Sequence, residues 1–146
     1  MNDGGRRLLG VDVGARRIGL AVSQGRIAVP LTIIEHETRA SDLDRVAAAA
    51  REQDAAAIVI GLPLHMSGDE GEQARRSRRF GDALARRVEV PVVYQDERYS
   101  TAAVTGAAGG RIEHARGAAR RGKPRVDDLA AAVILQAYID AQEAAE

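Results

Sequence analysis

The stretch "LLGVDVGARRIGLAVS", residues 8–23, carries a single carboxylate inside an otherwise apolar run. The part before Gly14 is rich in β-branched residues and ends at a glycine, which is typical of a strand, and the apolar residues after the turn predict its hairpin partner. Alternation along the first strand places Val11 and Val13 on one face and Asp12 on the other. A carboxylate in such surroundings must be solvated at the strand end, paired, or bound to a metal.

The rest of the chain predicts strands and helices that alternate. Residues 25–34 form a third extended run, in which Pro30 favours an edge or bulged strand. A helix capped by Ser41 is expected over 41–54. Two buried strands and three further helices are expected over these ranges: strands 55–63 and 90–100, and helices 69–88, 100–110 and 126–145. Three strands followed by alternating units predict an α/β fold, a mixed five-stranded sheet with helices on its faces.

Length and composition limit the classes of protein that fit. The 146 residues match one domain, 1–146, and the lack of cysteine excludes a disulfide framework and a cysteine-ligated metal. This composition favours a reducing, cytoplasmic location. No apolar run reaches the length of a membrane span, and the N-terminus has no signal-peptide core, so no membrane partner is expected. The 21 basic and 21 acidic residues cancel, and the four aromatic residues disfavour a base-stacking platform.

Two further groups of acids interrupt apolar patterns. Glu97 lies in "DER", residues 96–98, directly after a predicted strand, and Asp127 and Asp128 open the final helix. Each position has an ordinary structural explanation. Asp12 suits a turn that accepts amide hydrogens, the "DER" triplet suits a surface ion-pair cluster, and acids at a helix start favour the helix dipole.

Considered together, the acids suggest a metal site. Ligands gather at the carboxyl ends of strands in sheets flanked by helices, and Asp12 and Glu97 are both predicted to lie there. An acid on the final helix, Asp127 or Asp128, could complete the set. Clustered carboxylates need cations, and oxygen-only ligation suits Mg²⁺ or Mn²⁺. Two such ions about 3.5–4 Å apart are a known device for in-line phosphoryl displacement.

Basic residues lie near these acids in the sequence. Residues 111–125 hold six basic residues against one acid and lead to Asp127, so contact with phosphates is favoured over a solvated loop. The arginines of 75–87 are instead expected to form a solvated helix face. The candidates for binding nucleic-acid phosphates are Arg16, Arg17, Arg98, Arg120, Arg121, Lys123 and Arg125.

Four motifs, in this order and spacing, resemble one known family. They are "GVDVGARRIGLAVS" (10–23), "VIGLPLHMSGDEGEQA" (59–74), "VYQDERYST" (93–101) and "VDDLAAAVILQAYI" (126–139). The chain resembles the YqgF family of pre-16S rRNA nucleases, also called RuvX or Holliday-junction-resolvase-like proteins. The resemblance covers nearly the whole chain and implies the ribonuclease-H-like fold of RuvC-type resolvases.

The resemblance also implies an activity and a set of site residues. Asp12, Glu97 and Asp127 match the family's acids, and Asp128 is a lesser candidate ligand. The implied activity is metal-dependent cleavage of nucleic acid in the maturation of the 5′ end of 16S rRNA. Resolution of junctions in branched DNA is the alternative, and it would need a homodimer where an RNA-trimming enzyme could be a monomer. The family usually has other residues where His65 and Tyr99 stand, and their roles are left open.

Two other classes of protein compete with a nuclease. An actin-like or sugar-kinase protein also uses an Asp-x-Gly hairpin, but it needs two lobes and a second phosphate loop, for which this chain is too short. A non-catalytic nucleic-acid binding module would not benefit from concentrated negative charge beside phosphates. Both are therefore less favoured than a nuclease.

Overall fold

The computed structural model describes residues 6–98 and 126–145, with the side chains of the second range described from residue 129 onward. Its elements occur in the predicted order. They are β1 (Arg7–Val13), β2 (Arg17–Gln24), β3 (Ile27–Glu35), α1 (Arg39–Glu52), β4 (Ala55–Leu62), α2 (Glu72–Ala85), β5 (Val92–Asp96) and α5 (Val126–Ala145). The helix expected over 100–110 lies outside the described residues. None of the described helices is long and apolar enough to cross a bilayer.

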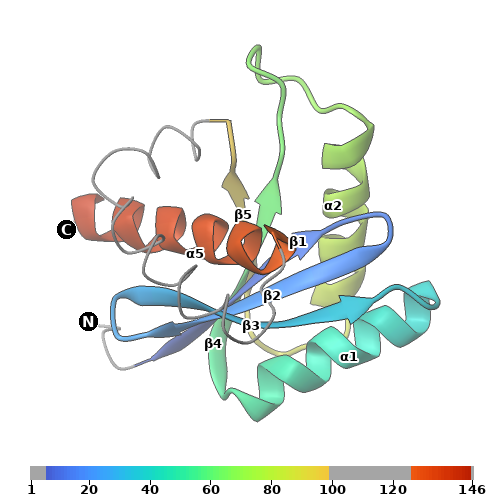
Figure 1. Ribbon diagram of the computed structural model, residues 1–146, viewed down its shortest axis with the longest axis horizontal. Helices are drawn as coiled ribbons and strands as arrows, with labels where there is room; N and C mark the ends of the chain where they lie inside the picture. Colours follow the sequence, from blue (N-terminus) through green and yellow to red (C-terminus); the bar gives the residue numbers. More distant parts are fainter. Residues whose placement is uncertain (1–5, 99–125, 146) are drawn as a thin grey trace.

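The five strands form one mixed sheet in the order β3-β2-β1-β4-β5 (Figure 1). The pairs β1–β2 and β2–β3 are antiparallel, whereas β1–β4 and β4–β5 are parallel. The carboxyl ends of β1, β4 and β5 therefore meet at one edge of the sheet. This is the edge at which the sequence predicts Asp12 and Glu97.

The antiparallel half of the sheet follows from local sequence signals. The turn between β2 and β3 places Gly25 at φ 63°, a conformation that suits glycine, and the tight turn sets the register Gln24↔Ile27. The pairing of β2 with β3 is irregular beside Pro30, and β3 is the outermost strand. The prediction from Pro30 of an edge or bulged strand is confirmed.

Helices cover both faces of the sheet (Figure 1). The β1 residues Leu9, Val11 and Val13 pack in a core with α1 and α2, and the opposite face packs against α5. A side chain at Gly10 would come within 2.8 Å of Leu135 Cβ, so this glycine lets α5 approach the sheet closely. Asp12 lies on the α5 face because it shares the alternation of Gly10.

Three local predictions are corrected by the structure. The cap of α1 is Thr38, whose hydroxyl accepts a hydrogen bond from the Ser41 N–H at 3.0 Å, so Ser41 is already inside the helix. Helix α2 starts at Glu72 rather than at residue 69, and Gly71 caps it without a side-chain hydrogen bond. Strand β5 is half-buried rather than buried, because it lies at the end of the sheet order and lacks a described strand on its outer side.

Candidate active site at the carboxyl edge of the sheet

Two of the predicted acids lie at the carboxyl edge of the parallel strands. Asp12 is the penultimate residue of β1, and Glu97 directly follows β5. The Glu97 N–H donates a hydrogen bond of 3.1 Å to the Leu62 carbonyl oxygen, which fixes the end of β5 to β4. Both side chains are partly buried. Asp12 and Glu97 are called the carboxylate pair below.

Strand β4 lies between β1 and β5, and it has a glycine, Gly61, at the position that lies between the two acids. In register, Val11 pairs with Ile60, so Gly61 is the next β4 residue beside Asp12. A Cβ atom at Gly61 would lie 2.6 Å from Oε2 of Glu97. The Glu97 carboxylate therefore occupies the space over β4 that any other residue would fill.

The electrostatics of Glu97 depend on this placement. Burial, followed by the negative charges of Asp12 and Asp96, raises the pKa of Glu97 from 4.5 to about 7. The charge of Asp12 acts on Glu97 in keeping with the register, which places Asp12 beside Gly61. Repulsion between like charges in a partly dehydrated site is the condition that a bound cation relieves.

The other two charges of the "DER" triplet pair with each other. Asp96 accepts hydrogen bonds from the Arg98 backbone N–H and Nε, both at 2.9 Å, and its Oδ2 lies 2.7 Å from Nη2. The hydrogen bond from the Arg98 side chain is the main cause that lowers the pKa of Asp96. Arg98 Nη1 also donates to the Met66 carbonyl oxygen at 3.3 Å, which ties the β4–α2 loop to this edge. From the sequence alone, a surface ion-pair cluster is one explanation of the "DER" triplet. This explanation is correct for Asp96 and Arg98, whereas the Glu97 side chain lies over Gly61.

The acids of the last helix are only partly described. Asp127 and Asp128 lie in the first turn of α5, but their side chains are outside the described part. Among the described residues, no group of three potential metal-ligating side chains occurs. The structure therefore brings together Asp12 and Glu97, and leaves the third acid as a prediction.

The predicted phosphate-binding residues have different surroundings. Arg16 is exposed on the β1–β2 turn, and Arg17 Nε lies 3.4 Å from Glu35 Oε2. Arg98 is held by Asp96 and Met66, as described above. His65 is exposed in the β4–α2 loop. The remaining residues of these predictions, Tyr99, Arg120, Arg121, Lys123 and Arg125, lie outside the described ranges.

Sequence reasoning missed Gly61. Its signal was a glycine inside the apolar strand run "AAAIVIGL", because a glycine within a strand often marks the close approach of another group. What the strand pattern could not supply was the identity of the approaching group, since Glu97 is 36 positions away along the chain.

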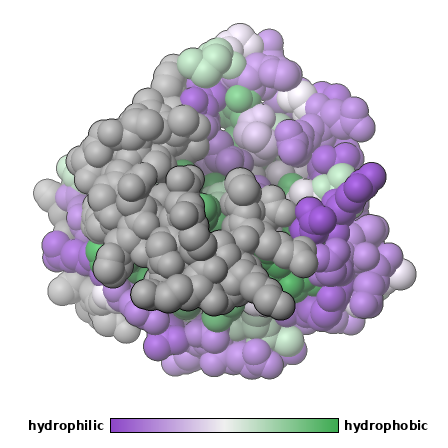
Figure 2. Space-filling model, viewed as in Figure 1, coloured by the Kyte–Doolittle hydropathy of each residue, from purple (hydrophilic) through white to green (hydrophobic). Residues whose placement is uncertain are grey.

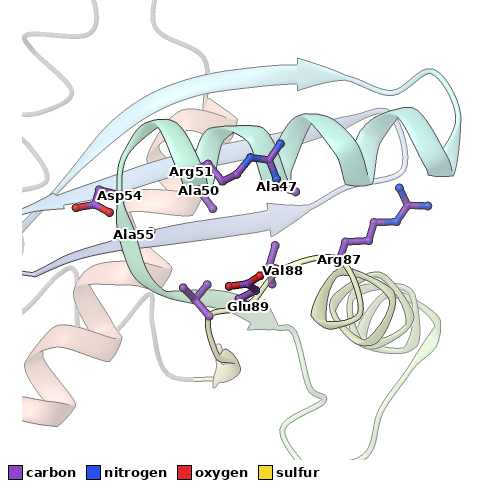
Figure 3. Close-up of a pocket in the computed structure, with 9 residues that line it drawn as sticks. Ala47, Ala50, Arg51, Asp54, Ala55, Arg87, Val88 and Glu89 are labelled. Carbon is purple, nitrogen blue, oxygen red and sulfur yellow. The ribbon is translucent and has the colours of Figure 1, made fainter.

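A hollow of about 380 Å³ lies at a distance from the carboxylate pair (Figure 3). Its lining includes Asp54 and Ala55 at the start of β4, together with Arg87 and Glu89, which follow α2. It is therefore at the amino edge of the parallel strands, away from the carboxylate pair. Its charged residues carry both signs, and it offers no clustered acids for a metal.

Comparisons with known proteins match nearly the whole chain to one family. Residues 6–141 match the model of the family described as "RuvX: Holliday junction resolvase". A relative from Anaeromyxobacter sp. (strain Fw109-5), named "Putative pre-16S rRNA nuclease", is 45% identical over 140 residues, which cover 94% of this chain and 99% of the relative. A relative of the same name from Lactococcus lactis subsp. cremoris (strain MG1363) is 39% identical, over 92% of this chain and 94% of the relative.

Solved structures show the same fold at low sequence identity. RuvC from T. thermophilus in complex with a Holliday junction substrate has a TM-score of 0.61 at 17% identity, over 94% of this chain and 96% of that one. The fowlpox virus resolvase bound to Holliday junction DNA has a TM-score of 0.57 at 10% identity, over 93% of this chain and 98% of that one. The predicted ribonuclease-H-like, RuvC-type fold is confirmed.

Proposed function

Because this chain belongs to the RuvX family, we propose that it is a metal-dependent nuclease that hydrolyses phosphodiester bonds in nucleic acid. The catalytic metal ligands in this proposal are Asp12, Glu97 and Asp127, with Asp128 as a further candidate. The whole of residues 1–146 acts as one nuclease domain. Its substrate is a ribosomal RNA precursor, which agrees with the cytoplasmic location expected from the sequence.

The observation that carries the proposal is the carboxylate pair facing across Gly61. Two acids whose negative charges repel each other in a partly buried site destabilise the fold, and a divalent cation would offset that repulsion. Their donor atoms are all oxygens, which fits Mg²⁺ or Mn²⁺ rather than softer metals. The described residues therefore fit such a cation, and a pair of ions is the usual arrangement for in-line phosphoryl displacement.

The position of Asp127 supports its role as the third ligand. Residues 127, 131 and 134 share one face of a helix by its 3.6-residue period. Leu135 and the Ala131 carbonyl oxygen come against Gly10, and Ile134 comes against Gly61, on the face of the sheet that carries Asp12. Asp127 is one turn before Ala131 on that face.

Each part of this chain has a role in the proposed reaction. Divalent ions, when bound, activate water for attack and stabilise the leaving oxygen. The end of β1 and the end of β5 hold Asp12 and Glu97 on rigid strands, and Gly61 leaves room between them. In this proposal Arg16 on the β1–β2 turn and Arg17 at the start of β2 contact phosphates, as do the basic residues ahead of Asp127.

The substrate in this proposal is precursor 16S rRNA, from the names of the relatives at 36–45% identity. The alternative is resolution of a DNA junction, which the description of the family and the two resolvase complexes favour. Symmetric junction cleavage requires two active sites and hence a homodimer, whereas trimming of RNA can be done by a monomer. A monomer in sedimentation of the purified chain, measured alongside the cleavage assay, would therefore count against junction resolution.

The test is cleavage of a labelled RNA that spans the 5′ end of 16S rRNA and of a four-way DNA junction, with Mg²⁺ and with Mn²⁺. We expect the RNA to be cleaved in the presence of either metal and not in EDTA. Asp12→Asn, Glu97→Gln and Asp127→Asn should each reduce the cleavage rate by at least about 100-fold, because each removes a proposed ligand.

Control variants remove the same charges elsewhere. Asp44→Asn and Glu52→Gln change exposed acids on α1, away from the carboxyl edge, and should cleave at the wild-type rate. The proposal fails if Asp12→Asn cleaves as fast as the wild type. Preferential cleavage of the junction would replace the RNA substrate with the DNA alternative.

A further inference from the structure

A second charged hollow lies on the face of the sheet opposite the carboxylate pair. It has a volume of about 260 Å³ and is formed by the β1–β2 turn, the start of α1 and the middle of α2. Gly14 and Ala15 line it from the turn, Arg39 from α1, and Arg76 and Arg79 from α2. These residues define the arginine hollow. Figure 1 shows that the three elements lie on one side of the molecule, and Figure 2 shows that this side is strongly hydrophilic.

Three other arginines on or beside these two helices have acidic partners. Arg45 pairs with Asp42, Arg78 with Glu70, and Arg87, which follows α2, with Asp44. Within the described residues, the side chains of the three arginines of the hollow have no ion pair or hydrogen bond. Three guanidinium groups without acidic partners thus line one hollow, which is a favourable arrangement for an anion.

One acid also lines the hollow, and its charge is already engaged. Asp42 is 3% exposed, and its two carboxylate oxygens lie 2.5 Å from His36 Nδ1 and 2.7 Å from Arg45 Nη2. It also accepts a hydrogen bond of 3.1 Å from the Glu37 N–H. Burial raises the pKa of Asp42, but the hydrogen bonds from His36, Glu37 and Arg45 together lower it. The Asp42 carboxylate is therefore held by His36, Glu37 and Arg45, and none of the three arginines of the hollow pairs with it.

The hollow is close to the proposed active site along the backbone. Gly14 and Ala15 are the second and third residues after Asp12. An extended chain spans at most about 3.6 Å per residue, so the Ala15 Cα lies within about 11 Å of the Asp12 Cα. Successive phosphates of one strand advance by about 3.4 Å along a duplex axis. A strand bound at the carboxylate pair would need only a few nucleotides to reach the hollow, passing exposed Arg16 at the turn.

We propose that the arginine hollow binds backbone phosphates of the nucleic-acid strand that is cleaved at the carboxylate pair. The nucleic-acid strand crosses the β1–β2 turn, so that consecutive parts of this nucleic acid lie on the two faces of the protein's sheet. This inference rests on the proposed nuclease function and adds the path of the substrate. It replaces the expectation that arginines 76 and 79 only form a solvated helix face.

The test measures binding separately from cleavage. A fluorescein-labelled single-stranded RNA is titrated with protein in EDTA over a series of salt concentrations. Arg39→Gln/Arg79→Gln changes two exposed residues and should weaken binding at low salt by at least about 10-fold. The slope of log K against log salt should become shallower by about 1.4, because each lost phosphate contact on a single strand removes about 0.7.

The chain offers a matched control on the same helices. Arg51→Gln/Arg86→Gln removes two exposed arginines from the far ends of α1 and α2, and should leave the affinity and the slope at wild-type values. Arg76→Gln alone, which removes the third arginine that lines the hollow, should reduce the slope by about 0.7. Thermal unfolding of every variant checks that the fold is retained.

The outcomes separate this inference from the proposed function. Equal losses in the two double variants, or no loss in Arg39→Gln/Arg79→Gln, would overturn the arginine hollow even if the enzyme cleaves RNA. A wild-type protein that binds RNA through the hollow but cleaves neither substrate would overturn the nuclease instead. With cleavable RNA and Mg²⁺, we expect the hollow variant to raise KM while kcat stays near the wild-type value.

Discussion

The absence of a side chain at position 61 is what allows Asp12 and Glu97 to interact. Gly61→Ala would add a Cβ atom 2.6 Å from Glu97 Oε2, so the carboxylate must move. Because misplacement by about 1 Å can cost about 100-fold in rate, we expect cleavage to fall by 10- to 100-fold. Binding of Mn²⁺, measured by calorimetry, should weaken as well.

A second variant separates this effect from general destabilisation. The new Cβ would also meet the Cδ1 atom of Ile134, and Ile134→Val removes that atom. Gly61→Ala/Ile134→Val should therefore recover much of the thermal stability without recovering cleavage. If cleavage returned together with stability, Gly61 would matter only for packing.

The raised pKa of Glu97 predicts a dependence of stability on pH in metal-free buffer. Since the pKa of Glu97 is about 7 in the folded protein and 4.5 in the reference state, the folded state binds the proton more tightly. Its contribution to stability is fully present below pH 4.5 and is lost as the pH rises to about 7. Glu97→Gln keeps the hydrogen-bonding shape without the charge.

We therefore expect Glu97→Gln to be more stable than the wild type at pH 8, by on the order of 1–2 kcal/mol after allowance for solvent screening. The difference should disappear near pH 4. Urea unfolding in EDTA at both pH values measures it. If the difference in stability between Glu97→Gln and the wild type were the same at pH 4 and pH 8, the Glu97 pKa would not be raised. Adding Mg²⁺ at pH 8 should make the wild type the more stable of the two proteins, because the ion binds its folded state.

At the scale of elements, one buried amide attaches α5 to the β2–β3 hairpin. Gln136 is 2% exposed, accepts a hydrogen bond of 2.9 Å from the Ala28 N–H, and donates one of 3.1 Å to the Arg26 carbonyl oxygen. Gln136→Met keeps the volume but leaves these backbone groups without partners. We expect a loss of about 2 kcal/mol in the free energy of unfolding, measured with urea.

A control on another helix tests this explanation. Gln73→Met makes the same chemical change at an exposed position of α2 and should alter stability by less than about 0.5 kcal/mol. Comparable losses in both variants would mean that the Gln136 hydrogen bonds are not the cause. Retained cleavage in Gln136→Met is expected, because the carboxylate pair lies at the other edge of the sheet.

The bounds of an element are predictable from sequence where its local residue pattern and its packing in the fold favour the same structure. The last helix was expected over 126–145 and has these bounds, because its apolar residues recur at helical spacing and bury against the sheet. The start of α1 was misplaced, since Thr38 and Ser41 are both good caps and the sequence alone does not rank them. The half-buried state of β5 depends on strand order, which the apolar run "VPVVY" does not reveal.

At the scale of the whole molecule, the zero net charge conceals a separation of charges. The carboxylate pair lies on the α5 face of the sheet, and the arginine hollow lies on the face covered by α1 and α2. The order of elements was enough to predict a mixed sheet and the edge that holds Asp12 and Glu97. The hollow was not predictable, because it joins a turn to helix positions more than 60 residues later, and only tertiary packing brings them together.

The irregular outer strand β3 has a consequence for self-association. A regular, uncovered strand can template the addition of a strand from another molecule, which is how many sheets polymerise. Pro30 offers no amide hydrogen, and the register shift beside it disturbs the regular repeat that an incoming strand would have to match. The described part of this flank is therefore a poor template for the addition of a strand from another molecule.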